Sequence, residues 1–334
     1  MSRSAFMYSM RLVCLTMFLP AILGCEPKTA KTQPAPTSVR TLSTPFRGTV
    51  WETPFGQGQK IATRHYQIFT TVQDSALLAT LPGFMEAAYQ NYLDIVQQDI
   101  PPNQPMPMYM MASRAEWEAL TINRFGHAGP ARVVEDGGYT FQGVTVCWAI
   151  GRTATFSVAS HEGMHQFLYH ALKNRLPLWA EEGLATTAEG FILDRGTVRF
   201  TPDQNLMRLT DLRTAIIHGH WLDLPTLLTT NTAAVARSGE QAKTVGYYGQ
   251  LYALMSFLRH DETYGPKWRA MFHAAREGKF QEVLSRGQMQ LRGMFYYQLV
   301  GRQLFEHYIT TDLETFEADF LRYARQLVKL PPRE

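Results

Sequence analysis

The sequence has little net charge and, beyond its first residues, no long apolar run. Its 334 residues include 32 lysines and arginines against 29 aspartates and glutamates, a formal charge of +3. Because positive and negative charges are nearly balanced, the sequence gives no sign of a strongly basic surface for binding nucleic acid. No stretch after residue 24 is long and apolar enough for a membrane-spanning helix, which needs about 20 such residues. A hydrophobic content of 45% still allows a sizeable core in one or two domains.

Residues 1–24 have the pattern of a targeting signal. Arg3 and Arg11 make a basic start, and residues 12–23 form an apolar run that is too short to span a bilayer. Removal of this segment would lower the formal charge from +3 to +1.

The signal ends in Ile22-Leu23-Gly24-Cys25, which resembles the lipobox of bacterial lipoproteins. The resemblance implies that Cys25 is lipidated and becomes the mature N-terminus, and several acyl chains hold a protein firmly at a bilayer. We therefore expect a bacterial cell-envelope protein, on the outer membrane if the cell is Gram-negative, as Glu26 after the cysteine suggests. An ordinary signal peptide or an uncleaved anchor is the alternative.

Cysteine is scarce, with three residues in the whole chain. Cys14 would leave with the signal and Cys25 would be acylated, so Cys147 would remain unpaired. A disulfide framework within one mature chain and a cysteine-based zinc site are both excluded. We expect Cys147 to be a small buried apolar residue.

Residues 25–60 are predicted to be the lipidated cysteine followed by a flexible tether. Residues 26–45 are rich in Pro, Thr, Lys, Ser and Gln and contain almost nothing that a core could bury. Residues 61–330 are then the folded domain.

Apolar periodicity in this domain predicts both strands and helices. Residues 65–70, 106–111 and 143–150 alternate as strands do, and Val144, Val146 and Trp148 fall on one face of the last one. A helix is expected after Asp74, as its cap, with Pro82 as a possible kink. Shorter helical patterns follow at 114–120, 203–232, 247–260, 267–277 and 313–327. The predicted fold class is α+β.

His161-Glu162-Gly163-Met164-His165 is the segment with the clearest chemical meaning. Histidines four apart lie on one face of a helix, so both imidazoles can reach one metal ion. The intervening Glu162 can accept a proton from a water activated there. Helical spacing from residue 156 to 172, with Thr or Ser as the cap, places this segment on a helix.

A third ligand is available after Pro177, where Leu178-Trp179-Ala180-Glu181-Glu182-Gly183 begins a second helix. A catalytic zinc ion takes two histidines and one carboxylate and leaves one position open. Spacing alone leaves Glu181 and Glu182 as equal candidates.

The phrase His-Glu-x-x-His followed by Leu-Pro-x-Trp-x-x-Glu-Gly-x-Ala resembles the gluzincin metallopeptidases, and in particular the bacterial peptidase-MA-like family. The similarity is strong at these two motifs and looser over the remainder of residues 65–325. It implies that His161, His165 and Glu182 hold one Zn²⁺ and that Glu181 is a solvated neighbour. It also implies a zincin-like arrangement, with a small N-terminal sheet whose edge strand lies beside the His-Glu-x-x-His helix, followed by a mostly helical part.

Two further features of the family find candidates here. The edge strand that pairs with the substrate backbone would be the one containing Val144, Thr145, Val146 and Cys147, although an ordinary internal strand is equally compatible with the pattern. A tyrosine that stabilises the oxyanion would be Tyr248, which matches the Tyr-x-Gln phrase of the peptidase-MA-like group, with Tyr247 as the alternative.

For other polar residues near the motifs, the sequence supports only less specific expectations. Thr186 and Glu189 lie one and two turns beyond Glu182, where either could hydrogen-bond a metal ligand. His170 points away from the metal face, and His218 and His220 have no carboxylate at ligand spacing, so these three are expected to be structural.

The expected function is hydrolysis of peptide bonds in the cell envelope, with a peptide or protein substrate and no nucleic-acid partner. The chain has no Gly-x-Met-Glu-Asn phrase of the aminopeptidases, which favours internal cleavage. A zinc-binding but inactive envelope lipoprotein is one alternative, and an amide hydrolase acting on another envelope polymer is the other.

Overall fold

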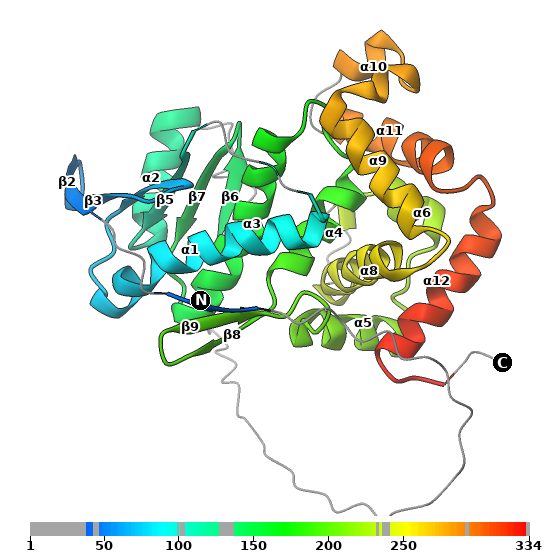
Figure 1. Ribbon diagram of the computed structural model, residues 1–334, viewed down its shortest axis with the longest axis horizontal. Coiled ribbons are helices and arrows are strands. Elements are labelled where there is room, and N and C mark those ends of the chain that lie inside the picture. Colours follow the sequence, from blue (N-terminus) through cyan, green and yellow to red (C-terminus); the bar gives the residue numbers. More distant parts are fainter. Residues whose placement is uncertain are drawn as a thin grey trace, which may run out of the picture. The chain divides into compact units, whose positions relative to one another are not determined.

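A six-stranded mixed sheet forms the N-terminal part of the protein in a computed structural model (Figure 1). The structure describes residues 38–42, 47–98, 100, 104–126, 137–231, 234–235, 241–290 and 294–331. The strands of the sheet are β2 (Arg47–Thr53), β3 (Gly56–Ala62), β4 (Tyr66–Thr70), β5 (Met106–Met111), β6 (Gly138–Phe141) and β7 (Val144–Trp148). Their order is β2-β3-β4-β5-β7-β6, in which the β4-β5 and β5-β7 pairs are parallel and the others antiparallel.

Helices cover both faces of this sheet. Helices α1 (Ser75–Val96) and α3 (Arg152–Ala171) pack on one face, in the same core as Ile68 and Met108. Helix α2 (Arg114–Phe125) covers the opposite face, where Trp117 contacts the ring of Trp148. The predicted alternation of the 143–150 strand is confirmed, because Val144, Val146 and Trp148 face α2 while Cys147 is buried in the other core.

The remainder of the chain is mostly helical, which confirms the α+β class. The helices are α4 (Leu178–Ala188), α5 (Leu206–His218), α6 (Leu224–Thr229), α8 (Gln241–His260), α9 (Gly265–Glu277), η2 (Lys279–Glu282), α10 (Arg286–Gln290), α11 (Met294–Tyr308) and α12 (Leu313–Leu327). Helix α4 lies next to the sheet in Figure 1, and the helices after it lie on the right of the picture. One hydrophobic core continues from α1 and α3 through α4 into α8, α11 and α12.

A second, three-stranded sheet joins the start of the described chain to its middle. Strand β1 (Val39–Thr41) pairs with β9 (Thr197–Phe200), which also pairs with β8 (Phe191–Asp194). The prediction that the tether extends to residue 60 is therefore wrong, since β1, β2 and most of β3 lie before that boundary. Only Gly58 and Ile61 of β3 are buried. These strands are held largely by backbone hydrogen bonds. Such pairing does not require apolar side chains, so the amino-acid composition gives no sign of it.

Local sequence signals explain several of the element boundaries. Asp74 caps α1 as expected, with its carboxylate accepting from the amides of Ala76 and Leu77, and the helix continues through Pro82. Helix α3 differs from expectation: its N-cap is Gly151, at φ +96°, without a side-chain cap. Thr155 instead accepts a hydrogen bond from the amide of Ile150, which anchors the turn that precedes the helix.

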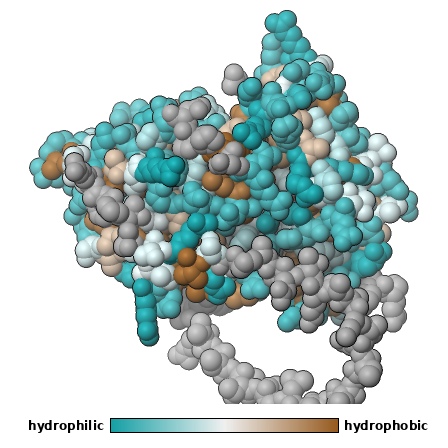
Figure 2. Space-filling view, in the orientation of Figure 1, coloured by the Kyte–Doolittle hydropathy of each residue, from teal (hydrophilic) through white to brown (hydrophobic). Residues whose placement is uncertain are grey.

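The predicted signal, lipobox and Cys25 lie outside the described residues. Within the described part of the chain, no helix combines the length and the apolar character that crossing a bilayer requires. The face shown in Figure 2 is mainly hydrophilic, and its hydrophobic residues form small, separate groups.

Candidate metal centre

Helix α3 presents His161 and His165 from one face, one turn apart, while its opposite face is buried. Phe156, Met164 and Phe167 from that buried face belong to the main core. Gly163 is required by the packing, because a Cβ there would collide with the hydroxyl of Tyr92, which donates to the carbonyl of Ser160 at 2.9 Å. The glycine between the two histidines thus lets α1 and α3 pack closely.

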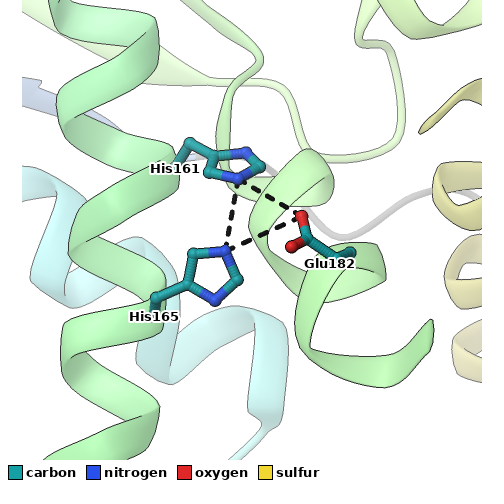
Figure 3. Close-up of side chains that lie close together, drawn as sticks. All are labelled: His161, His165 and Glu182. Atoms are coloured by element: carbon teal, nitrogen blue, oxygen red, sulfur yellow. Dashed lines mark hydrogen bonds and ion pairs between the residues drawn. The ribbon is translucent and has the colours of Figure 1, made fainter. Parts of the chain in front are cut away.

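Helix α4 brings the third side chain. Pro177 is its N-cap, in extended conformation, so the chain turns and the new helix packs against α3. Trp179 anchors α4 in the core, where its indole nitrogen donates to the carbonyl of Gly301 in α11 at 3.2 Å. This anchoring leaves Glu182 facing the two histidines (Figure 3).

The three side chains form a group that can hold a metal ion. Nε2 of His161 lies 3.3 Å from Nε2 of His165, and Oε2 of Glu182 lies 3.5 Å and 3.7 Å from these two nitrogens. Ligand atoms of a tetrahedral zinc site, with bonds of about 2.0–2.1 Å, lie about 3.3–3.4 Å apart. The observed triangle is therefore close to one face of such a tetrahedron.

Glu182 Oε2 supports the same conclusion, since it is buried and has no hydrogen-bond partner among the described residues. The exposed fractions of the three side chains are small, between 13% and 16%. A buried carboxylate oxygen without a donor is costly. A cation at the centre of the triangle would satisfy it.

The carboxylates around the centre favour the binding of a cation there. Burial by itself would lower the pKa of His161, but the neighbouring carboxylates of Glu182 and Glu189 raise it to about 10. Burial would likewise raise the pKa of Glu182, yet the two histidines hold it well below its usual range. The negative potential that makes the imidazoles bind protons tightly also favours a metal ion in place of those protons.

Glu189 makes the contact expected of it. Its Oε1 lies 2.7 Å from Nδ1 of His161, so Nδ1 donates to the carboxylate and Nε2 is directed to the centre of the group. Thr186 also contacts Glu182, but through the backbone and not through the carboxylate. Its hydroxyl donates to the backbone carbonyls of Glu182 and Gly183 within α4, because a threonine inside a helix can bond the carbonyls of its own preceding turn.

Glu162, the expected proton acceptor, lies on α3 next to His161 and is partly exposed. Its backbone carbonyl accepts hydrogen bonds from the hydroxyls of Thr140 at 2.7 Å and Thr145 at 3.3 Å. These bonds tie the β6-β7 hairpin to α3 at the candidate base. Glu162 is not one of the three residues of the metal-binding group.

The strand that contains Val144, Thr145, Val146 and Cys147 is not at the edge of the sheet, so this prediction is wrong. It is β7, which pairs with β5 on one side and β6 on the other. The antiparallel hairpin adds β6 beyond it, and no other described strand pairs with β6. The edge beside the motif helix is therefore β6, as its contact with Glu162 shows.

The two tyrosines differ in accessibility. Tyr247 is fully buried, and its hydroxyl has no hydrogen-bond partner among the described residues. Tyr248 is partly exposed, and its ring centroid lies 6.4 Å from that of His161. Only Tyr248 combines proximity to the metal-binding group with access from outside.

Glu181 is not the solvated neighbour that was expected. Its side chain is 14% exposed, almost as little as Glu182, and its carboxylate lies 3.8 Å from Arg175. Burial raises its pKa above the usual range. Glu181 is therefore a buried carboxyl group paired with an arginine of the segment between α3 and α4.

The remaining histidines and Cys147 lie outside the metal-binding group. His170 contacts the carbonyl of Gly143 at 3.1 Å, and neither it nor His218 or His220 belongs to the metal-binding group. Cys147 is buried, and burial raises the pKa of its thiol well above the usual value.

The structure adds residues that the motifs did not indicate. Asn205 donates to Glu189 Oε2 at 3.2 Å, and Arg208 donates to both oxygens of the same carboxylate. The one sign of these partners in the sequence is Glu189 itself, because a carboxylate that becomes buried needs hydrogen-bond donors. Which later helix supplies them could not be read from local patterns.

The donor set of two imidazoles and one carboxylate is suited to a Lewis-acidic divalent ion, and Glu162 beside it can accept and return a proton. Comparison of the sequence with models of known protein families and with curated proteins finds no match.

Proposed function

We propose that this protein is a zinc-dependent peptidase of the gluzincin type. The observation that carries the proposal is the triangle of His161, His165 and Glu182, with its separations of 3.3–3.7 Å. Two histidines and one carboxylate suit Zn²⁺, and three protein ligands leave a position open for chemistry. A closed structural site would need no proton acceptor beside it, and Glu162, next to His161 on α3, is available for that role.

A bound zinc ion would supply a Lewis acid at the centre of the triangle and would lower the pKa of water there. Glu162 accepts the proton from the attacking water and returns it to the leaving amine. Glu189 keeps the ring of His161 in the orientation that presents Nε2. Tyr248 donates a hydrogen bond to the developing oxyanion, a contribution worth about 3–4 kcal/mol where such a donor has been removed.

A polypeptide substrate is supported by strand β6. An extended chain can add to the open edge of a strand through main-chain hydrogen bonds, without sequence preference. The bond between the Thr140 hydroxyl and the backbone carbonyl of Glu162 joins this strand to the helix that carries the proposed proton acceptor. Peptides bound along β6 would therefore pass the metal centre.

We also propose that the enzyme acts in the bacterial cell envelope, anchored through a lipid on Cys25. The proposal rests on the lipobox-like Ile22-Leu23-Gly24-Cys25 after a basic and apolar start. Globomycin treatment of expressing bacteria, followed by mass analysis of the N-terminus, tests it. An unmodified Cys25 in the untreated cells would contradict it.

The proposed function is tested by zinc content and peptide turnover in three proteins. We expect about one zinc per chain in the parent, a marked loss in Glu182→Gln, and zinc retention without turnover in Glu162→Gln. Zinc is measured by elemental analysis and turnover with a fluorogenic peptide library.

Each alternative gives a different result. A parent that binds no zinc after reloading contradicts the metal centre. A parent that binds zinc but cleaves neither peptides nor cell-wall amides is the inactive envelope protein, and cleavage of cell-wall amides alone identifies the other hydrolase class.

A further inference from the structure

A buried carboxylate and an arginine lie immediately behind the metal-binding group. Nε of Arg208 donates to Oε2 of Glu189 at 2.7 Å, and Nη2 donates to Oε1 at 2.8 Å. The Glu189 side chain is 4% exposed and that of Arg208 is 14% exposed. This is the two-pronged arrangement in which an arginine binds a carboxylate with fixed geometry.

Glu189 Oε1 contacts two partners, the second of which is Nδ1 of His161 at 2.7 Å. Arg208 therefore acts on a metal-binding histidine through one shared carboxylate. Because a carboxylate oxygen accepts hydrogen bonds, Nδ1 of His161 is the donor and Nε2 stays directed at the metal-binding group.

The same guanidinium also lies against Tyr248. Its central carbon is 5.0 Å from the centroid of the Tyr248 ring. The remaining nitrogen, Nη1, donates to Oδ2 of Asp211 at 3.1 Å. All three nitrogens of Arg208 thus bond to carboxylates of this chain, so the side chain is engaged in holding protein groups.

The packing of α5 against α8 sets the position of Arg208 relative to Tyr248. A Cβ on Gly249 would lie 2.6 Å from the backbone nitrogen of Leu212, and one on Gly246 would lie 2.9 Å from the Cβ of Ala215. The two glycines lie on either side of Tyr248 and let α8 approach α5 one and two turns beyond Arg208. The contact between guanidinium and ring is therefore built into the helix crossing.

We propose that Arg208 is a positioning residue that holds His161, through Glu189, and Tyr248 in one fixed arrangement. The inference rests on the proposed function, since it assigns to Arg208 the orientation of one metal ligand and of the oxyanion donor. It extends that function to α5, a helix that contributes no residue to the metal-binding group.

The experiment compares Arg208→Gln and Arg208→Lys with Arg213→Gln, a control on the same helix. Arg213 donates to the carbonyl of Val328 at 2.6 Å and does not belong to the metal-binding group. Zinc dissociation constants are measured by chelator competition, and circular dichroism confirms that each protein is folded.

We expect Arg208→Gln to weaken zinc binding about 10–100-fold, which is the usual effect of losing a partner that orients a ligand. Arg208→Lys should lie between this variant and the parent, because an ammonium keeps the charge but not the fork. Arg213→Gln should bind as the parent does. If Arg208→Gln does not fold, Arg208→Lys carries the comparison.

A double-mutant cycle tests the contact with Tyr248. If Arg208 positions the tyrosine, Tyr248→Phe should reduce kcat less in the Arg208→Gln background than in the parent. Parent-like zinc affinity in folded Arg208→Gln would overturn the link to His161, and independent effects on kcat would overturn the link to Tyr248.

Failure of the proposed function gives a different result. A parent that binds zinc but has no peptidase activity, with weakened binding in Arg208→Gln, contradicts the peptidase and leaves the role of Arg208 at the metal standing. A parent that binds no zinc overturns both.

Discussion

Glu181 and Glu182 are neighbours in the sequence and have different surroundings. Glu182 faces two imidazoles, which hold its pKa low, whereas Glu181 lies beside Arg175 and has a raised pKa because it is buried. Successive residues of a helix point about 100° apart, so only one of the two can face α3. The chemical role of each is thus set by the rotation of α4.

Asp203 shows the same dependence on surroundings away from the metal centre. Its Oδ1 accepts hydrogen bonds from Nη1 of Arg259 at 3.0 Å and Nε2 of His260 at 2.8 Å, which joins the turn before α5 to the end of α8. Burial would raise the pKa of Asp203, but these two partners lower it overall.

We predict that Asp203→Asn lowers the free energy of unfolding at pH 7 by about 1–2 kcal/mol, less than for a fully buried charged pair because the side chain is 29% exposed. The folded pKa lies below the unfolded value of about 3.9, so the contribution is complete above that value and disappears as the pH falls through the folded pKa. Urea unfolding at pH 7 and at decreasing pH measures both effects.

Glu118→Gln, at an exposed position of α2, is the control for Asp203→Asn. It should change stability little at any of these pH values. A difference between parent and Asp203→Asn that stays constant as the pH falls from 7 to well below the unfolded pKa of about 3.9 would show that Asp203 does not titrate with a lowered pKa.

At the scale of elements, the β6-β7 hairpin decides which strand borders the site. Strand β7 has the stronger apolar alternation, and that character is explained by its position between β5 and β6, with helices on both faces. The edge strand β6 is short and ends in the exposed Phe141. A strongly apolar strand pattern is typical of the inside of a sheet.

The close crossing of helices α5 and α8 also depends on single residues. We predict that Gly249→Ala destabilises the protein by about 1–3 kcal/mol, because the new methyl group meets the α5 backbone, and the gain in helix propensity of about 1 kcal/mol offsets this only in part. Zinc affinity should fall as well, since α5 carries Arg208.

Gly287→Ala in α10 is the matched control, because the nearest atom to its added Cβ, Ser285 Oγ, is 4.0 Å away. It should leave stability and zinc binding unchanged or raise stability slightly. Equal stabilities of Gly249→Ala and the parent in urea unfolding would show that the helices can separate without cost.

At the scale of the whole molecule, the metal-binding group lies where the sheet-covering helix α3 meets the first helix of the C-terminal part, α4. Glu189 and Arg208 extend its contacts to α5, and Tyr248 extends them to α8. A bound ion would therefore join parts of one continuous core.

We predict that removal of zinc lowers the melting temperature by several degrees. An ion bound only by the folded state stabilises it by about 4 kcal/mol at 1,000 times its dissociation constant, and about 2–4 °C of melting temperature corresponds to 1 kcal/mol in a domain somewhat smaller than this one. Calorimetry with and without a chelator measures the shift. Glu182→Gln should melt at the same temperature in both conditions, and an equal response of parent and variant would contradict binding at this group.

The sequence by itself determined the features that depend on local spacing. The type of the main helices and strands, the cap at Asp74, and the placement of His161 and His165 on one helix face all follow from periodicity over a few residues. Glu182 was distinguished from Glu181 by resemblance to a family, since spacing left both open.

Tertiary structure alone decided what depends on contacts between distant segments. The pairing of β1 with β9 shortened the expected tether, the position of β6 beyond β7 moved the sheet edge, and the approach of α5 to α8 placed Arg208 between Glu189 and Tyr248. Such contacts arise from the packing of whole surfaces, in which one-residue changes of register or rotation exchange buried and exposed side chains. Local sequence does not contain that information, so the metal-binding group and the contact of Glu189 could be predicted, whereas Asn205 and Arg208 could not.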